Sequence, residues 1–523
     1  MPKTALTYKV LFRQSHLIAQ RTRRLARFGL SFNPNLSKFM KFLRHHPTRG
    51  GFAAKNQYLI GSGLAIAIAA MAGMTAAPAH AMEGDDRRLN VLIVFCDDLD
   101  TAPLGFMGND IVRTPNIDTL AAEGLNFTNA FVTTSICITS RGNMLTGRYA
   151  SRTDIWFDGF EDLTPEQQTM SYSTRLREAG YHTGYVGKWH LGPAAEHLFD
   201  DNRAFLGQGF FWDEEHPPGE GRHLTDRIGD DAVDMIRVSP REKPFVITVG
   251  FKAPHVQDGF HPIEPYPPTP STAVLYELDE MPAPPLSDAE FFENQPDFIR
   301  ESLGRVRWNY RLGPPESLNF QRSVRRYYRM VTAVDQQVGR MMQALRDSGR
   351  LDNTIVIFTS DHGMYLGERG LAGKWLGHDT SIRIPFVVWD PRLPQSERGQ
   401  ERDAMTLLID VKPTLLEWAG VEPHESVQGR SIASIIAGET PADWRTEFFY
   451  EHHDFGHVIP RSEGVRTERH KYLRYLDSDP LFEELYDLEA DPREANNLAG
   501  DPEHAELLER MRAKWQQWQE DVK

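Results

Sequence analysis

Cysteine is almost absent from this chain, which has only Cys96 and Cys137 among its 523 residues. Two cysteines cannot build the disulfide framework that stabilises small secreted domains. In an exported protein the two could still pair, but we expect Cys96 to be a small buried core residue instead. The sequence also lacks low-complexity tracts and internal repeats, which excludes a repeat array. Its length and ordinary apolar content suit one large domain and a smaller one.

Acidic residues are missing from residues 1–57, which are basic. The apolar run 58–71 follows, and residues 77–81 (Ala-Pro-Ala-His-Ala) fit the cleavage pattern of a secretory signal. This run is short for a membrane span. We therefore expect residues 1–81 to be a basic N-terminal region and signal peptide, and the mature protein to be periplasmic or secreted with no stable membrane anchor. The alternatives are a retained anchor, a twin-arginine signal at Arg23-Arg24, and a true start at Met40.

The mature protein is predicted to be strongly acidic. Residues 1–81 carry twelve Lys and Arg and no acid, so their removal would change the formal net charge from −15 to −27. Such a protein has no general basic surface that could release counterions from nucleic acid, which we do not expect as a partner. An anionic substrate would need a local group of basic residues that overcomes the repulsive field.

Continuous apolar runs at residues 90–95, 245–249 and 354–358 are typical of strands that helices cover on both faces. Helical patterns lie between them, at residues 116–123 and 322–346. The pattern predicts an α/β domain over residues 82–430, with a mainly parallel doubly wound sheet flanked by helices. Residues 431–523 are predicted to form a C-terminal subdomain, because alternating runs at 446–450 and 471–475 and a charged helix from about Glu503 indicate a small antiparallel sheet with a helix.

A Pro-rich and then polar segment, residues 262–315, shows no strong periodicity. We interpret it as a long insertion over the strand ends that shapes the substrate site, with a merely decorative loop as the alternative.

Polar residues follow the three continuous apolar runs and a fourth short run, residues 185–187. In open α/β sheets, ligands bind beyond the carboxyl ends of the strands, so these residues are expected to share one site. They are Asp97-Asp98, Lys188-Trp189-His190, Lys252 with His255, and Asp361-His362.

The side chains predict a metal site that also binds an anionic substrate. The acids and His362 form a mainly oxygen-donor set suited to Ca²⁺ or Mg²⁺, with zinc as an alternative through His362. Arg141, Lys188 and Lys374 could hold a tetrahedral anion. His190 and His255 are candidate proton carriers. Candidates to line the substrate pocket are His452, His453 and His457.

Cys137 lies in the segment Ser-Ile-Cys-Ile-Thr-Ser-Arg (135–141), just before Met-Leu-Thr-Gly-Arg-Tyr (144–149). This segment resembles the nucleophile segment of the type I sulfatases, a family within the alkaline-phosphatase-like superfamily. Further runs across nearly the whole mature chain are similar to that family: residues 90–98, 114–118, 184–192, 252–255, 359–363, 464–468 and 484–488.

The resemblance implies a formylglycine mechanism. A formylglycine-generating maturation enzyme would oxidise Cys137 to formylglycine (3-oxoalanine), whose hydrate would attack sulfur. That residue would bind a divalent cation, typically calcium, together with Asp97, Asp98, Asp361 and His362. Arg141 would hold the hydrate, and Lys188 and Lys374 would clamp the sulfate oxygens. His255 would protonate the leaving alcohol, and His190 would help to collapse the sulfated intermediate.

The sequence departs from the family pattern at Thr139, which stands where the family has proline. Because Arg141 and Thr146-Gly147-Arg148 follow the pattern, we expect Cys137 to be converted. The motif after Lys374 is also looser. The leading hypothesis is an exported sulfatase acting on sulfated carbohydrate or another sulfate ester. The alternatives are a phosphonate or phosphodiester hydrolase of the same superfamily, and a catalytically silent glycan-binding protein with an unmodified Cys137.

Overall fold

The computed structural model describes residues 88–193, 195–212, 221–257 and 265–523. Residues 84–523 form one compact unit, distinct from residues 1–83. The predicted signal peptide and the alternatives to it lie outside the described residues. Among the residues that are described, no helix is both long enough and apolar enough to cross a membrane. The division at residue 430 stays a prediction.

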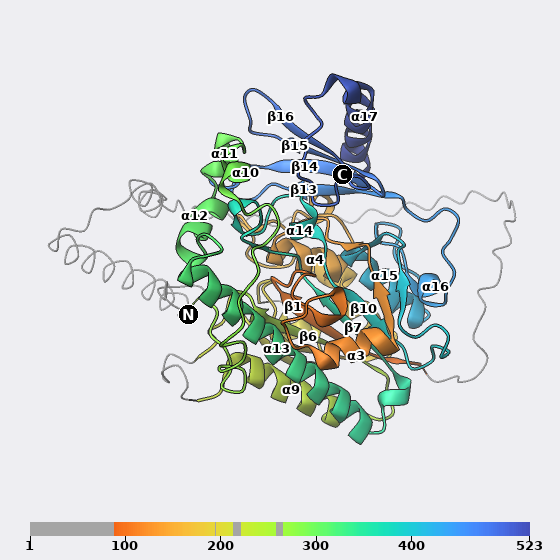
Figure 1. Ribbon diagram of the computed structural model, residues 1–523. Helices are drawn as coiled ribbons and strands as arrows, with labels where there is room; N and C mark the ends of the chain where they lie inside the picture. Colours follow the sequence, from red (N-terminus) through yellow and green to blue (C-terminus); the bar gives the residue numbers. More distant parts are fainter. Residues whose placement is uncertain (1–87, 194, 213–220, 258–264) are drawn as a thin grey trace, which may run out of the picture. The chain divides into compact units, whose positions relative to one another are not determined.

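An eight-stranded sheet forms the centre of this unit (Figure 1). Five neighbouring strands, from β7 to β5 in the sheet order, run parallel, and β10 runs antiparallel to both of its neighbours. In sheet order the strands are β11 (Gln400–Arg402), β2 (Leu125–Phe127), β10 (Phe386–Trp389), β7 (Thr354–Ser360), β1 (Asn90–Asp97), β6 (Phe245–Pro254), β4 (His182–Lys188) and β5 (Asp201–Phe205). The predicted parallel, doubly wound α/β architecture is confirmed, with β10 as an unforeseen antiparallel strand.

Strand β1 explains why the strand sequences are continuous apolar runs. Every residue of β1 is buried. Val91, Ile93 and Phe95 join one hydrophobic cluster, whereas Leu92 and Val94 join a second cluster on the opposite face. A strand with apolar neighbours on both faces gains from burying every side chain, so alternation disappears.

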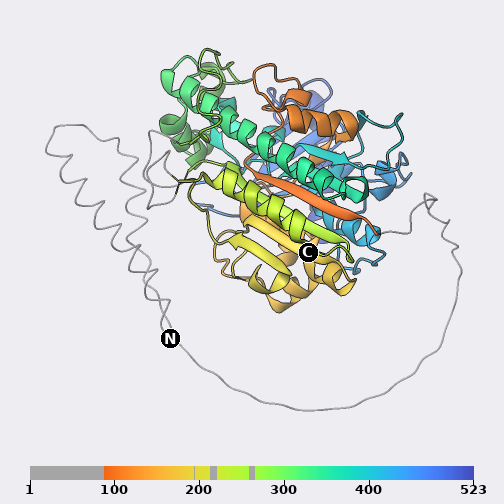
Figure 2. The same ribbon diagram turned by 90° about the horizontal axis from the view of Figure 1, so that it is seen from below.

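Within the described part of the chain, helices pack on both faces of the sheet. Helices α9 and α13 lie side by side along one face, as both views show (Figures 1 and 2). This face also carries α3, and the other carries the helix that begins at Cys137. The bounds are α3 (Pro115–Glu123), α9 (Leu224–Val238) and α13 (Leu318–Asp347) on the first face, and α4 (Cys137–Thr146), α7 (Tyr172–Glu178) and α15 (Val411–Trp418) on the second.

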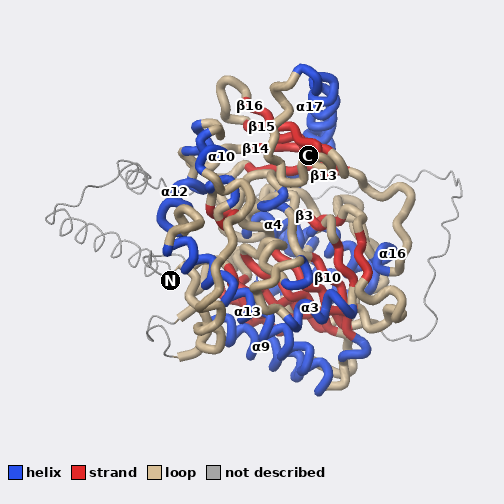
Figure 3. Tube along the Cα trace, viewed as in Figure 1, coloured by secondary structure: helices blue, strands red, loops and turns tan. Residues whose placement is uncertain are grey.

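Short helices and strands lie in the chain segments that connect the longer elements (Figure 3). They are α5 (Ala150–Thr153), α6 (Pro165–Met170), α8 (Ala195–Leu198), α14 (Asp379–Ile382), α16 (Ala433–Ile436), the strand pair β3 (Ala130–Phe131) and β12 (Thr406–Leu407), and the pair β8 (Tyr365–Leu366) and β9 (Ala372–Gly373).

The predicted insertion contains three helices that the sequence did not indicate: α10 (Ala289–Glu293), α11 (Asp297–Arg300) and α12 (Leu303–Arg311). The longest has nine residues, too few to show a helical period clearly in sequence. The amide N–H of Leu303, at the start of α12, donates a 2.9 Å hydrogen bond to the carbonyl oxygen of Val458. The insertion therefore contacts the C-terminal part of the chain.

The C-terminal part is the predicted antiparallel sheet with a helix packed on it. Its strands, in order, are β13 (Glu447–His452), β14 (Ser462–Thr467), β15 (His470–Tyr475) and β16 (Phe482–Asp487), and its helix is α17 (Ala505–Asp521). The indole of Trp515 donates to Glu463 at 2.9 Å, and that of Trp518 donates to Glu447 at 3.0 Å. These bonds tie α17 to the sheet.

Buried ion pairs connect this sheet to the segment that carries Lys374. Lys471 on β15 pairs with Asp379 at the start of α14 and, at 2.5 Å, with Glu494. His378, next to Asp379, lies 2.9 Å from Glu484 on β16. The position of the Lys374 segment thus depends on the C-terminal sheet.

Candidate active site

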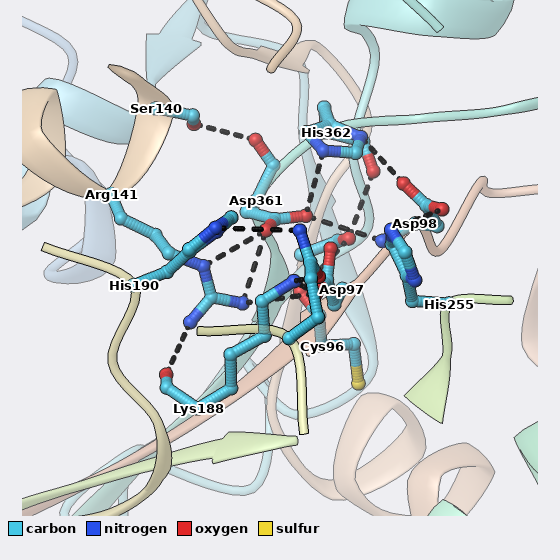
Figure 4. A network of polar contacts seen from close by, with 12 residues as sticks. Cys96, Asp97, Asp98, Ser140, Arg141, Lys188, His190, His255, Asp361 and His362 are labelled. Atoms are coloured by element: carbon cyan, nitrogen blue, oxygen red, sulfur yellow. Dashed lines mark hydrogen bonds and ion pairs between the residues drawn. The ribbon is translucent and has the colours of Figure 1, made fainter. Parts of the chain in front are cut away.

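The polar residues that follow the predicted strands lie together at one edge of the sheet. The strands that carry them, β7, β1, β6 and β4, are consecutive neighbours in the sheet, and all four run parallel. Their carboxyl ends therefore meet, and they bring together Asp97, Asp98, Lys188, His190, His255, Asp361 and His362 (Figure 4). Arg141 arrives from α4 and Lys374 from the segment after β9.

Each acid of this cluster is paired with a different cation. The ammonium group of Lys188 forms an ion pair with Asp97. Lys374 Nζ lies 2.6 Å from Asp98 Oδ1. An Arg141 guanidinium nitrogen lies 3.0 Å from Asp361 Oδ2. Three carboxylates thus balance three cations. A bound divalent cation would leave the centre positively charged, which suits an anionic substrate.

The donor set fits a metal ion. Among the described residues, two groups bring three metal-binding atoms within 4.8 Å of one another: Asp97, Cys137 and His362, and Asp97, Asp98 and His255. Asp97 Oδ1 and His362 Nε2 are buried and make no hydrogen bond within the described part of the chain. A cation bound between them would satisfy both atoms. Carboxylate-rich sets with one imidazole favour Ca²⁺ or Mg²⁺.

These groups differ in part from the predicted ligand set. Asp361 belongs to neither group, and its carboxylate is bound by Arg141. His255, predicted as a proton carrier, belongs to one group and lies 3.6 Å from Asp98. The ligand roles of the predicted residues stay a prediction.

The pKa values of the acids reflect this charge balance. Burial raises the pKa of Asp97, but the charges of Lys188, His255, Arg141 and Lys374 together outweigh burial and hold the pKa well below its usual range. Asp361 behaves in the opposite way, because burial and the Asp97 carboxylate together raise its pKa to about 7. A cation at the site would favour the ionised form of every acid around it.

Cys137 is the first residue of α4, and only 2% of its surface is exposed. The first N–H groups of a helix have no partners within it and favour negative charge nearby. Burial raises the pKa of the thiol, but the ammonium groups of Lys374 and Lys188 dominate and lower it below its ordinary value. Both cysteines are free thiols, so the alternative of a Cys96–Cys137 bridge is wrong.

The two candidate proton carriers occupy different surroundings. His255 Nδ1 lies 2.7 Å from the carbonyl oxygen of Val256, which fixes the proton on that nitrogen and leaves Nε2 facing Asp98. His190 is partly exposed at the edge of the cluster, and burial with the nearby charge of Lys188 lowers its pKa to about 2. His190 is therefore neutral at ordinary pH.

Three residues of the site hold left-handed backbone although none is glycine. Asp98 has φ of 64°, His190 has φ of 66°, and Trp375, next to Lys374, has φ of 89°. Such conformations persist only where the surroundings enforce them. They turn the chain sharply at the strand ends and aim the functional side chains inward.

Sequence reasoning missed three residues that complete the network. Gln208 accepts a 2.7 Å hydrogen bond from Lys188 Nζ. Tyr185 donates to the carbonyl oxygen of Lys188 at 2.6 Å, and Ser140 donates to that of Asp361. Gln208 follows β5, an edge strand that begins with Asp, Asn and Arg. This polar sequence has no apolar run, so it did not predict a strand. Its signal was the turn sequence Gly207-Gln208-Gly209.

The insertion and the C-terminal part together line a cavity of about 300 Å³. Phe298, Glu301 and Ser302 come from the insertion, and His457 and Asp477 come from the C-terminal part. Ser302 also lines a much smaller cavity that reaches Lys374.

Of the three C-terminal histidines predicted to line a substrate pocket, His457 lines this cavity. His452 is fully buried in β13, and His453 stacks on Trp156 with ring centroids 4.8 Å apart.

A family model described as Sulfatase matches residues 89–421, which is more than half of the chain. The chain belongs to the sulfatase family. A second model, described as N-sulphoglucosamine sulphohydrolase, C-terminal, matches residues 367–521 of this sulfatase. Membership of the family makes the chain a sulfuric ester hydrolase.

Several relatives of this chain are named as sulfatases. The sulfatase is 27% identical to an N-acetylglucosamine-6-O-sulfatase of Bacteroides thetaiotaomicron, over 82% of the chain and 85% of the relative. It is 28% identical to an arylsulfatase of Clostridium perfringens, over 81% and 92%. It is also 29% identical to PehA of Trinickia caryophylli, a multifunctional alkaline phosphatase superfamily protein, over 78% and 89%.

Solved structures share the fold. BT4656, solved with its substrate D-glucosamine-2-N,6-O-disulfate, superposes with a TM-score of 0.73 at 26% identity, over 83% of this sulfatase and 98% of that chain. A phosphonate monoester hydrolase of Agrobacterium radiobacter superposes with a TM-score of 0.64 at 23% identity, over 83% and 96%. The second likeness is one of fold alone.

Proposed function

We propose that this protein is an exported sulfatase that hydrolyses sulfate esters of carbohydrate, through a formylglycine made from Cys137 and a bound divalent cation. The observation that carries the proposal is the cluster of three buried cations and three carboxylates around Cys137 at the N-terminus of α4. Cations that surround a nucleophile stabilise the negative charge that spreads over sulfate oxygens in the transition state.

Each residue has a proposed part in this chemistry. The formylglycine would supply the nucleophilic oxygen, and the cation, held by Asp97, Asp98, Asp361 and His362, would supply positive charge beside it. Lys188 and Lys374 bind sulfate oxygens, and Arg141 holds the nucleophile in place. His255, protonated on both ring nitrogens, would give its Nε2 proton to the leaving oxygen and keep the Nδ1 proton that faces Val256. His190 would accept a proton at Nε2.

The cavity between the insertion and the C-terminal part supports a carbohydrate substrate. Its volume of about 300 Å³ can hold a sugar unit. The aromatic ring of Phe298, the hydroxyl of Ser302 and the imidazole of His457 offer the apolar and hydrogen-bonding contacts that sugars use. The acids Glu301 and Asp477 disfavour a second sulfate there. The relatives named as acting on sulfated glucosamine point to the same class.

The substrate class is tested by comparing a sulfated monosaccharide with a sulfated disaccharide. Phe298→Ala is expected to lower kcat/KM for the disaccharide and to leave the monosaccharide unchanged. An equal effect on both substrates, or activity on aryl sulfates alone, would count against a carbohydrate subsite.

Maturation of Cys137 is the step that Thr139 puts in question. Thr139 is the third residue of α4, and the first hydrogen bond of the helix joins the N–H of Ser140 to the carbonyl of Ile136. The N–H of Thr139 therefore lies before the helical bonds, so a proline at this position would break no hydrogen bond of the helix. The decisive measurement is the mass of the Cys137 peptide from protein made in its native host. An aldehyde mass supports the proposal, whereas an unmodified thiol favours a silent glycan-binding protein.

A phosphonate or phosphodiester hydrolase is the second candidate, because PehA, a multifunctional alkaline phosphatase superfamily protein, is among the relatives. The same cations and nucleophile would serve either reaction. Release of sulfate and of phosphonate from matched aryl esters separates the two. A larger kcat/KM for the phosphonate would overturn the sulfatase proposal.

A further inference from the structure

The loop after β5 directs one polar side chain into the catalytic cluster. Gln208 lies between Gly207, with φ of 73°, and Gly209, with φ of 67°. Left-handed backbone at both glycines turns the chain sharply on either side of Gln208. The neighbouring side chains of Leu206 and Phe210 are 57% and 55% exposed, whereas Gln208 is partly buried and reaches Lys188.

The orientation of the Gln208 amide follows from the chemistry of its partner. An ammonium group can only donate hydrogen bonds, so the atom 2.7 Å from Lys188 Nζ must be the amide oxygen. The amide nitrogen then faces His190 Nε2 at 3.3 Å. The reversed amide would set an NH₂ group against the ammonium group, donor against donor.

This orientation determines which nitrogen of His190 carries the proton. An amide NH₂ group can only donate, so His190 Nε2 must accept and must hold a lone pair. The proton of the neutral ring then lies on Nδ1. His190 Nδ1 makes no hydrogen bond within the described part of the chain, so there no other contact fixes the tautomer. In contrast, His255 has its Nδ1 fixed by a backbone carbonyl.

We propose that Gln208 is a positioning residue that fixes the neutral tautomer of His190 with the lone pair on Nε2. Lys188 orients the amide, and the amide orients the imidazole. The side chain thereby keeps Nε2 of His190 able to accept a proton at the reaction centre. The catalytic use of that atom rests on the proposed function, but the tautomer itself does not.

The tautomer can be measured without activity. Protein labelled with ¹⁵N in its histidines is compared with a His190→Asn variant, which assigns the His190 signals. We expect a protonated Nδ1 and an unprotonated Nε2 in the wild-type protein, and a loss of this single state in Gln208→Met. A proton on Nε2 of the wild-type ring would overturn the proposal. A protein that proves inactive on every sulfate ester would sink the proposed function and leave this result standing.

Kinetics separate a tautomer role from a role in merely holding Lys188. Gln208→Glu keeps the shape and accepts more strongly from Lys188, but its carboxylate also accepts from His190 and so favours the proton on Nε2. Gln208→Met keeps the length and removes both hydrogen bonds. We expect kcat to fall about 100-fold in Gln208→Glu and about 10-fold in Gln208→Met, within the usual range for acid–base groups, with smaller changes in KM. Thermal unfolding checks that each variant folds. A Glu variant more active than the Met variant would assign Gln208 to Lys188 instead and overturn the proposal.

Discussion

At the scale of single residues, the catalytic cluster is a set of mutually dependent charges. Lys188, Lys374 and Arg141 each neutralise one buried carboxylate. Removing one partner of a buried ion pair leaves an uncompensated charge and costs about 3–5 kcal/mol. A loss of activity after such a substitution therefore mixes chemistry with stability. Cys137 is a partner in none of these three ion pairs, so its replacement offers a cleaner test.

Cys137→Ala is expected to fold normally and to lose sulfate release by at least about a thousandfold, because the nucleophile is absent. Release of inorganic sulfate and thermal unfolding are measured on the same preparation. Cys96→Ala is the matched control: it removes a buried sulfur from β1 at a cost of about 1–2 kcal/mol, and it should keep its activity. Full activity in Cys137→Ala would refute the formylglycine mechanism.

Strand ends predict part of the site, whereas Cys137, Arg141 and Lys374 were predicted from the resemblance to a family or from their charge alone. Three of the predicted groups follow strands: Asp97-Asp98, Lys188 and Asp361-His362. Ligands bind beyond the carboxyl ends of parallel strands, so these groups are expected to share one site. Gln208 escaped because β5 is a half-exposed polar edge strand. Tyr185 escaped because its role depends on a tertiary hydrogen bond, to the carbonyl of Lys188. A spacing pattern cannot reveal such a bond.

At the scale of elements, helix α4 has a buried lysine at its C-terminal end. Its N-terminus carries Cys137, and at its C-terminal end Lys412 of α15 donates a 2.7 Å hydrogen bond to the carbonyl oxygen of Thr146. A positive charge near the C-terminus of a helix is favourable. However, Lys412 is only 1% exposed, and burial together with Arg148 and Arg175 lowers its pKa to about 7.

Lys412→Met is expected to change how stability depends on pH. In the unfolded chain a lysine has a pKa of about 10.4, so between pH 7 and pH 10 the unfolded state binds more protons than the folded state. The free energy of unfolding of the wild-type protein therefore gains a contribution that rises with pH, and the variant lacks it. The stability of the variant relative to wild type should fall by about 1–3 kcal/mol from pH 7 to pH 9.

Urea unfolding at each pH measures this difference. Lys243→Met, which changes an exposed lysine, is the control and should show no such trend. A constant difference between Lys412→Met and wild type across this range would mean that Lys412 stays charged in the folded protein.

The ion pairs between the C-terminal sheet and α14 make a second prediction at this scale. Lys471→Met leaves Glu494 and Asp379 with one cation fewer in a buried site, so we expect a loss of about 3 kcal/mol in the free energy of unfolding. The activity should fall as well, because the Lys374 segment packs on that sheet. The double variant Lys471→Met with Glu494→Gln should recover part of the stability. No recovery would indicate that packing, rather than charge, dominates there.

At the scale of the whole molecule, a bound cation would offset part of the negative charge of the chain. The mature chain is expected to carry a formal charge of about −27, and three of its acids meet in one buried cluster. A divalent cation that binds only the folded protein stabilises it by mass action, by about 2.7 kcal/mol at a hundred times its dissociation constant.

Removal of the cation is therefore expected to lower the Tm by about 3–6 °C. Thermal unfolding in excess calcium is compared with unfolding in a chelator, and elemental analysis identifies the bound metal. The Asp98→Asn variant should show little response to calcium. Equal Tm values with and without chelator, together with no bound metal, would remove the cation from the mechanism.

The left-handed backbone at Asp98, His190 and Trp375 has an evolutionary meaning. Conformations of this kind cost about 1–3 kcal/mol each, and they gather at active sites, where the strain serves function. A descendant protein that no longer needs its activity could gain stability from substitutions that return these three residues to an ordinary backbone conformation. Gain of stability through relaxation at the strand ends would thus mark the lineages in which this fold has ceased to be an enzyme.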